Sequence, residues 1–226
     1  MTTLRTATAA RAGTAGTPAG AVRLALKEWD VVVAALEQGR QAILVRKGGL
    51  EDPGRRLRVD TGWFWLYPTL FHARGVFLRP EYQSLLVPGM HRAPRRLARD
   101  RPRPAGHPRP VAPGHVSLRA VAQVVEALEA PSLDALRRLC NRTVWTEKYL
   151  TLRYRWREED RPLVLVLRIA SLPEPVEVAE LDEYGGCRSW LELRDPPDAA
   201  GAEPVWPADR LAAELTAVRE ALDGSR

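Results

Sequence analysis

The residues of this sequence that could do chemistry gather at the ends of two short apolar runs. The runs, Ala42 to Val45 and Trp63 to Tyr67, are predicted to form paired strands, because aliphatic and aromatic residues fill them and glycine, proline and polar residues bound them. At their ends stand a glycine pair and five polar side chains: Arg46, Lys47, Gly48, Gly49, Tyr67, Thr69 and His72. We expect this cluster, supported by Arg153 and Arg168, to bind a ligand.

The cluster suits a ligand that joins a phosphate to an aromatic base. In this hypothesis Arg46 and Lys47 contact the phosphate, Tyr67 stacks on the base, and Thr69 and His72 form hydrogen bonds. The glycine pair at 48–49 lacks the spacing of a P-loop or a dinucleotide-binding turn, so it is interpreted as a backbone nest for an anion or as a plain turn. The lead prediction is a protein that binds nucleic acid or a nucleotide-like ligand through a basic and aromatic cleft.

Two other functions stay open on the same residues. A hydrolase-type enzyme would use His72 as general acid and base, with Cys187 or a carboxylate as its partner. Cys187 follows a glycine pair at 185–186, and its other interpretation is a buried cysteine at the start of a strand. A structural or interaction protein is the third hypothesis, in which the polar residues satisfy one another.

The histidines and cysteines indicate neither a metal site nor a cofactor. Of the four histidines, only His72 lies away from the proline- and arginine-rich part of the sequence, and no second ligand stands four residues after it. The two cysteines, Cys140 and Cys187, do not form a CxxC pair. In the absence of a secretory signal, both are expected to be reduced thiols of a cytoplasmic protein.

The charge of the chain favours a polyanionic partner. Its 226 residues carry a formal net charge of +6 and a sequence pI near 9.8, which suits RNA or DNA. Much of the excess lies between Arg92 and Arg109, a segment interpreted as a solvated loop or linker or, alternatively, as an arm that meets phosphates. No apolar run reaches the ~18 residues that cross a membrane, so no membrane association is expected. The sequence carries no signal of an oligomeric state.

The periodicity of apolar residues predicts the elements that position these groups. Helices are expected at 22–38, closed by Gly39, and at 116–130, 132–140 and 211–222. Besides the two runs above, strands are expected at 144–157, 162–172 and 187–193, with a turn of the chain at Pro173 to Pro175. Because strands outnumber helices and do not alternate regularly with them, the predicted fold class is α+β, with a mixed or antiparallel curved sheet and flanking helices.

Composition divides the chain into three parts. Residues 1–20 are small, polar and aperiodic and are predicted to form a disordered tail. Residues 21–196 are predicted to form a single α+β domain, interrupted at about 90–115 by the proline- and arginine-rich loop or linker. Residues 204–226 are predicted to form a C-terminal helix and tail.

Five separated blocks of the sequence together resemble a known family. They are LKEWDVVVAALEQGRQAILVRKGG, FWLYPTLFH, VWTEKYLTLRYRW, RPLVLVLRIASL and EYGGCRSWLEL, and they span Leu26 to about Leu193. In this order the blocks are similar to an uncharacterised bacterial family of the domain-of-unknown-function type, eighteen-zero-two in that series; the resemblance implies no activity. The residues that match the family pattern are Trp29, Gly39, Arg46, Lys47, Gly48, Gly49, Tyr67, Pro68, Thr69, His72, Trp145, Tyr149, Arg153, Arg168, Tyr184, Gly186, Cys187 and Trp190.

A second resemblance concerns the segment from Gly39 to Arg46, a helix end followed by a strand. It is similar to the opening of ASCH domains, which belong to the PUA-like group of small RNA-associated β-barrels, and it implies that the curved sheet forms a PUA-like barrel. Gln41 and Leu44 depart from the ASCH pattern, in which a lysine and an acidic residue are usual. No catalytic residue is therefore carried over from that group.

Overall fold

The computed structural model describes residues 16–48, 52, 57, 59, 62–70, 75–86, 114–157 and 159–224. Four features of the sequence hypothesis lie wholly or largely outside the described residues: the predicted tail up to residue 15, Gly49, His72 and the proline- and arginine-rich segment at 90–113. None of the helices in the described ranges is long and apolar enough to cross a membrane.

Strands and helices follow one another irregularly along the described chain. The strands are β1 (Leu24–Trp29), β2 (Ile43–Arg46), β3 (Trp63–Thr69), β4 (His115–Glu129), β5 (Leu163–Ala179), β6 (Trp190–Glu192) and β7 (Glu203–Pro204). The α-helices are α1 (Asp30–Glu37), α2 (Leu133–Arg137), α3 (Glu147–Arg155) and α4 (Ala208–Asp223). Short 3-10 helices are η2 (Gly75–Phe77), η3 (Pro80–Leu85), η4 (Cys140–Arg142) and η5 (Asp182–Tyr184).

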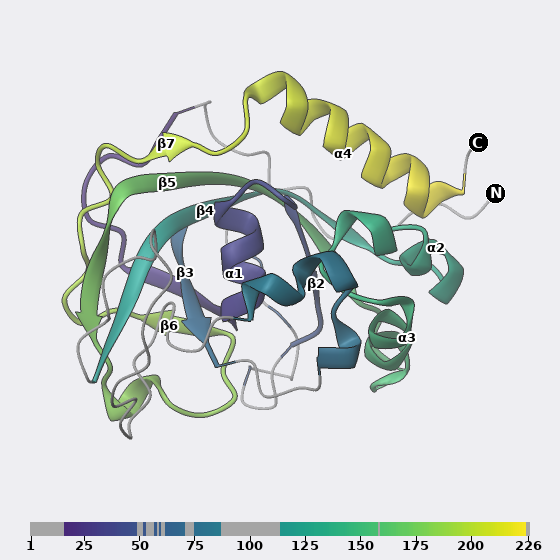
Figure 1. Ribbon diagram of the computed structural model, residues 1–226, viewed down its shortest axis with the longest axis horizontal. Helices are drawn as coiled ribbons and strands as arrows, with labels where there is room; N and C mark the ends of the chain where they lie inside the picture. The colour runs from purple at the N-terminus through teal and green to yellow at the C-terminus, as the bar shows by residue number, and fades with distance from the viewer. Residues whose placement is uncertain are drawn as a thin grey trace.

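In the described part of the chain, seven strands form one mixed and strongly curved sheet (Figure 1). The strand order is β2-β5-β4-β3-β1-β6, with β7 paired to β5. Strands β1 and β3 run parallel, and the other described pairs are antiparallel. The predicted class, α+β with a curved sheet and flanking helices, is therefore confirmed.

The long β4–β5 pair gives the sheet much of its curvature (Figure 1). Its register shifts between Leu118 and Ala120, where residues 172–175 of β5 face one residue of β4, Arg119. The Arg119 guanidinium donates to the carbonyl oxygens of Leu172 (3.0 Å) and Pro173 (3.1 Å) and so holds this bulge. The predicted turn at Pro173 to Pro175 is wrong, because the bulge absorbs both prolines and β5 continues beyond them.

The helix predicted at 116–130 is wrong, since this segment is strand β4. Its apolar residues are buried on both faces of the sheet: Val121 packs in one core, and its neighbours Ala120 and Ala122 pack in the other. A strand covered on both faces reads as an almost continuous apolar run, without the alternation of a half-exposed strand. Such a run matches a helical spacing by chance, and periodicity alone does not separate the two.

Two further elements differ from the prediction. The strand expected at 144–157 is largely helix α3, in which Leu150 is buried but Leu152 is 51% exposed, so the apparent alternation did not report two sheet faces. The single helix expected at 22–38 is strand β1 followed by α1. The change occurs at Asp30, whose carboxylate accepts the Val31 N–H (2.8 Å) in the first turn of α1.

The remaining predicted elements are confirmed, but one pairing is not. Strands β2, β3, β5 and β6 and helices α2 and α4 lie where they were expected, and the Ser132 hydroxyl caps α2 by accepting the Ala135 N–H (3.1 Å). Strands β2 and β3, predicted to pair with each other, do not: β2 pairs with β5, and β3 lies between β4 and β1.

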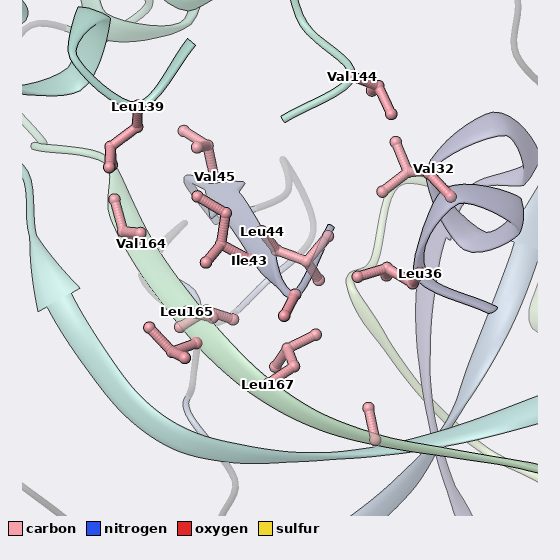
Figure 2. Packing of buried hydrophobic residues seen from close by; sticks show 14 of the residues in the cluster. Val32, Leu36, Ile43, Leu44, Val45, Leu139, Val144, Val164, Leu165 and Leu167 are labelled. Carbon is pink, nitrogen blue, oxygen red and sulfur yellow. The ribbon is translucent and has the colours of Figure 1, made fainter. Parts of the chain in front are cut away.

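Two apolar cores lie on the two faces of the sheet. The larger one contains buried residues of α1, β2 and β5, with α1 packed against β1, β3, β4 and β5, and Figure 2 shows Leu36, Ile43 and Leu167 within it. The smaller one contains Trp65 and Tyr67 of β3. Because six successive residues of α1, 31–36, are buried, this helix is fixed between the sheet and η3 and cannot shift without opening the core.

Candidate functional site

A cavity of about 650 Å³ opens at the carboxyl ends of β1, β2 and β3. One wall is α3 with Trp145, two residues before it, and Trp156, directly after it, and another is the segment 184–189 that precedes β6. Residues 27–29, 44–48, 67, 69, 70 and 180 complete the described lining. The described members of the predicted cluster at the ends of β2 and β3 therefore line one cavity, although the two strands are not paired in the way the sequence suggested.

A buried ion pair occupies the floor of this cavity. Arg46 donates to the carboxylate of Glu28 (2.8 Å), to the carbonyl of Lys27 (3.0 Å) and to the hydroxyl of Ser189 (3.0 Å). The second carboxylate oxygen of Glu28 accepts the Trp29 N–H (2.9 Å). With side-chain exposures of 13% and 9%, Arg46 and Glu28 neutralise each other inside the protein.

The polar network continues from Arg46 to a second carboxylate. Asp52 accepts hydrogen bonds from the Ser189 N–H (2.8 Å) and from the Ser189 hydroxyl (2.5 Å). Asp52 and Ser189 are both buried. The chain Glu28–Arg46–Ser189–Asp52 thus joins β1, β2 and the approach to β6 by charge-assisted bonds, which fixes the floor of the cavity.

Two lysines are saturated by backbone carbonyls on opposite walls. The Lys27 ammonium donates to the backbone carbonyls of residues 184 (2.8 Å), 185 (3.4 Å) and 186 (2.8 Å). The buried Lys47 ammonium donates to the backbone carbonyls of Tyr154 (2.8 Å), Arg157 (3.0 Å) and Trp156. Burial lowers the pKa of Lys47, and the Arg153 charge lowers it further. Each lysine therefore holds a wall in place.

Aromatic rings form a continuous part of the lining. Trp145 and Tyr149 stack with ring centroids 4.1 Å apart, and Trp29 meets Trp145 edge-on at 5.2 Å. Burial raises the pKa of Tyr149, whose charged neighbours are Arg153, Glu28 and Arg46. At neutral pH this hydroxyl is therefore protonated and can both donate and accept a hydrogen bond.

Arg153 stands one helical turn after Tyr149 and presents an unsaturated guanidinium. One of its terminal nitrogens donates to the Lys47 carbonyl (3.3 Å), and the guanidinium lies over the Trp156 ring, 4.9 Å from the centroid. Its Nε–H is buried, and no acceptor for it exists among the described residues. Burial lowers the pKa of Arg153, but an arginine stays charged. This donor is suited to an anion inside the cavity.

The structure brings most of the predicted site residues together and separates one. Those that line the cavity are Arg46, Lys47, Gly48, Tyr67, Thr69, Arg153 and Cys187. Arg168 does not line it; on β5 it donates to the Gln123 side chain (2.9 Å) across the sheet. Thr69 is engaged with the Glu28 carbonyl (3.1 Å), and Tyr67 is only 2% exposed and packs edge-on against Tyr184. The partly exposed aromatic residues of the lining are thus Trp29, Tyr149 and Trp156, since Trp145 is only 5% exposed.

Cys187 is exposed and lines the cavity, so its interpretation as a buried cysteine at a strand start is wrong. Neither Cys187 nor Cys140 forms a disulfide. His72, its predicted partner, lies outside the described residues. Within the described ranges, His, Cys, Asp and Glu side chains nowhere gather in threes as a metal ion would require.

Sequence reasoning missed several residues of the site. Lys27 and Glu28 were assigned to a helix rather than to the end of a strand, so their place beside Arg46 could not be seen. The available signal of this strand end was the pair of charged residues, Lys27 and Glu28, shortly before the apolar residues of α1. Asp52 and Ser189 lie far apart in the sequence, and no spacing rule connects them. Tyr149 matched the family pattern, but the strand predicted there hid its position on a helix, one turn before Arg153.

The chain matches one family model and is similar to two solved structures. A family model described as "Domain of unknown function (DUF1802)" matches residues 25–217. The crystal structure of an ASCH protein from Zymomonas mobilis is similar to the chain at a TM-score of 0.40 and 13% identity, covering 86% of this chain and 93% of that one. The crystal structure of a mutant ASCH protein from the same organism is similar at a TM-score of 0.41 and 11% identity, covering 89% of this chain and 99% of that one. No curated protein matches the chain.

Proposed function

The chain belongs to the DUF1802 family, as its five blocks indicated, and we propose that its cavity binds a nucleotide unit, a base with an attached phosphate. The unit is either a free nucleotide or one nucleotide of single-stranded RNA or DNA. One observation carries this proposal: stacked aromatic rings and an unsaturated guanidinium occur on the same wall of the cavity.

The charge of the cavity supports an anionic ligand. Five cationic side chains and two carboxylates line it, an excess of three positive charges: Lys27, Arg46, Lys47, Arg153 and Arg188 against Glu28 and Glu180. Charges that line a concave, partly desolvated site focus their field and raise the local concentration of the opposite ion. A phosphate suits this field better than a neutral or cationic ligand does.

The wall itself divides the ligand into two contacts. Tyr149, stacked on the buried Trp145, offers an aromatic face to the base, and base–aromatic stacking contributes about 1–3 kcal/mol per base. The Arg153 guanidinium and the Tyr149 hydroxyl supply donors to the phosphate. Arg46 and Lys47 act through their charge and by holding the walls, because the terminal nitrogens of Arg46 and the ammonium of Lys47 are already engaged.

The experiment is a titration of tryptophan fluorescence with adenosine monophosphate and with a short single-stranded oligonucleotide. We expect Arg153→Ala to weaken the binding of both ligands by about tenfold or more, because a charge-assisted contact contributes about 1.5–3 kcal/mol. Arg168→Ala is the matched control and should leave both affinities within about twofold. The absence of a saturable change with either ligand would reject the proposal.

The salt dependence distinguishes the two sources of the nucleotide. If the ligand is part of a polynucleotide, affinity for the oligonucleotide should fall steeply between about 50 mM and about 200 mM salt, because several phosphates are neutralised. A free nucleotide releases few counterions and should show a shallow slope. Comparing the two slopes on the same preparation assigns the source.

A hydrolase that uses the same cavity is the second candidate, favoured by the exposure of Cys187 at its lining. The Cys187 thiol, deprotonated by His72 or a carboxylate, would attack the phosphorus of the bound nucleotide and displace the ribose oxygen, which leaves as an alcohol after taking up the proton; water would then cleave the S–P bond and release phosphate. The prediction is turnover of a nucleotide that Cys187→Ala abolishes without loss of binding. Binding by the wild type with no product after prolonged incubation would leave only the first candidate.

A further inference from the structure

We infer that Lys47 is a positioning residue, whose ammonium holds the C-terminal turn of α3 in the orientation that makes it a wall of the cavity. The hydrogen-bond geometry carries this assignment by itself; its consequence for affinity rests on the proposed function.

The last carbonyl groups of an α-helix have no partner inside the helix and need one elsewhere. Lys47 donates to the carbonyls of Tyr154 and Arg157, at 2.8 and 3.0 Å, and to that of Trp156. A cation at this position also faces the negative end of the helix dipole. Because Lys47 is 3% exposed, water does not take its place in this structure.

The turn that Lys47 holds has an unusual backbone. Arg157 has φ of +51°, and it is the one non-glycine residue with positive φ among the described residues. This left-handed conformation disfavours a residue with a Cβ atom, so surrounding contacts must maintain it. Contacts that maintain it include the Lys47 and Asp160 N–H bonds to its carbonyl and the ion pair of its own guanidinium with Asp160 (3.0 Å).

The contact between Lys47 and α3 is reciprocal. The side chain of Lys47 binds the end of the helix, while its backbone carbonyl accepts a hydrogen bond from Arg153 (3.3 Å). Trp156, whose carbonyl Lys47 also binds, lies under the guanidinium groups of Arg153 and Arg157 at 4.9 and 4.5 Å. One residue at the end of β2 therefore sets the positions of both Arg153 and Trp156 in the wall.

The test compares Lys47→Met with Lys148→Met, which changes an exposed lysine on the same helix. Hydrogen exchange is measured on the full chain at two amides of the turn, those of Trp156 and Asp160, which bind the carbonyls of Leu152 and Arg157. We expect both amides to exchange at least about tenfold faster in K47M, as a locally opened turn does. In K148M they should exchange at the wild-type rate.

A second readout separates positioning from general stability. Adenosine monophosphate should bind K47M about tenfold more weakly, and K47Q, which keeps a donor for the carbonyls without the charge, should recover part of that loss. Wild-type exchange and wild-type affinity in a folded K47M would overturn the inference. Faster exchange in K47M, with no nucleotide binding by the wild type, would uphold the inference and reject the proposed function.

A variant that relieves the backbone keeps the test decisive if K47M fails to fold. Arg157→Gly places glycine at the left-handed position, which it adopts without strain, so K47M/R157G should fold where K47M does not. The two amides are then compared between R157G and K47M/R157G. Equal exchange rates in these two proteins would overturn the inference, and faster exchange in the double variant would support it.

Discussion

The polar side chains around the cavity form two groups, according to whether their donors are already engaged. Lys27 and Lys47 each donate to three carbonyls, and Arg46 is held by a carboxylate, a carbonyl and a hydroxyl. Arg46 and Arg153 each keep a buried Nε–H without an acceptor in the described chain, so they differ in their terminal nitrogens: both of those of Arg46 are engaged, whereas one of those of Arg153 donates to the Lys47 carbonyl. A saturated donor must lose existing bonds before it binds a ligand. Charge and residue type therefore do not identify the contact residues; the occupancy of each donor does.

The hydroxyl of Tyr149 is expected to contribute to affinity without contributing to stability. Tyr149→Phe keeps the ring stacked on Trp145 and removes the donor at the cavity wall. We predict that affinity for adenosine monophosphate falls about tenfold, as measured by fluorescence titration, while the melting temperature stays within about 2 °C of the wild type. A matching loss of stability would mean that the hydroxyl supports the fold instead.

The ion pair at the cavity floor should be costly to break from one side. Glu28→Ala leaves the Arg46 guanidinium buried without its carboxylate, which predicts a loss of about 3 kcal/mol or more in the free energy of unfolding. Asp134→Ala is the control, because the Asp134–Arg137 pair is exposed and should contribute less than about 1 kcal/mol. Urea titrations measure both. Equal losses in the two variants would contradict the buried character of the pair.

At the scale of elements, α3 depends on its neighbours. It has nine residues, of which Leu150 alone is fully buried, and no side chain caps its first turn. So short a helix is marginal by itself in water. Tertiary contacts must supply its stability, namely the aromatic stack at its start and Lys47 at its end. The wall of the cavity is therefore as rigid as these two contacts make it.

The junction between β2 and α3 should give the protein a pH dependence in the alkaline range. Burial, followed by the Arg153 charge, lowers the pKa of Lys47 from its ordinary 10.5; Arg157 acts in the same direction, while Asp160 and Glu159 oppose it. Between the lowered pKa and 10.5, the unfolded chain binds a proton that the folded chain has released. The contribution of Lys47 to the free energy of unfolding therefore rises with pH through this window.

Urea titrations of the wild type and Lys47→Met at about pH 8 and about pH 10 test this sign. The wild type minus K47M difference in unfolding free energy should increase between the two pH values. The same comparison with Lys148→Met, an exposed lysine, should show no such increase. A constant difference for K47M would mean that folding does not shift the pKa of Lys47.

At the scale of the whole molecule, the cavity is assembled from parts that are distant in sequence. Residues 27–29, 44–48, 67–70, 145–156 and 184–189 meet there because β1 and β3 are parallel neighbours and because the curved β4–β5 pair brings β2 round to α3 (Figure 1). The segment 90–113, whose arginines account for much of the net charge, lies outside the described residues. The excess of three positive charges counted at the cavity comes from described residues in other parts of the chain.

Replacement of Met90 to Pro113 by a short Gly-Ser linker should therefore leave nucleotide affinity within about twofold of the wild type. Any contribution of the segment as an arm should appear only with the oligonucleotide, as a shallower dependence of affinity on salt. Fluorescence titrations with both ligands measure these effects. Loss of adenosine monophosphate binding in a folded replacement variant would show that the segment belongs to the site.

The sequence predicted the elements whose local signals are strong. Strands β2 and β3 are bounded by glycine, proline and polar residues, α2 has a Ser132 cap, and α4 has an amphipathic pattern. The same reasoning failed at β4, where covering of both faces removed the alternation, and at α3, where accidental alternation suggested a strand. Arg168 was placed at the site because its type was suitable, whereas the sheet register directs it to Gln123.

By itself, then, the sequence determined the fold class and the place where basic and aromatic residues gather, since these follow from composition, short-range pattern and residue type, and the resemblance of its five blocks indicated the family. The tertiary structure alone decided which of those residues have donors to spare. Carbonyls of residues 154, 156 and 157 occupy Lys47, and Glu28, Ser189 and the Lys27 carbonyl occupy the terminal nitrogens of Arg46; one terminal nitrogen of Arg153 donates to the Lys47 carbonyl, and its Nε–H, like that of Arg46, stays unsatisfied in the described chain. Hydrogen-bond saturation depends on partners more than a hundred residues away, and no local pattern encodes them.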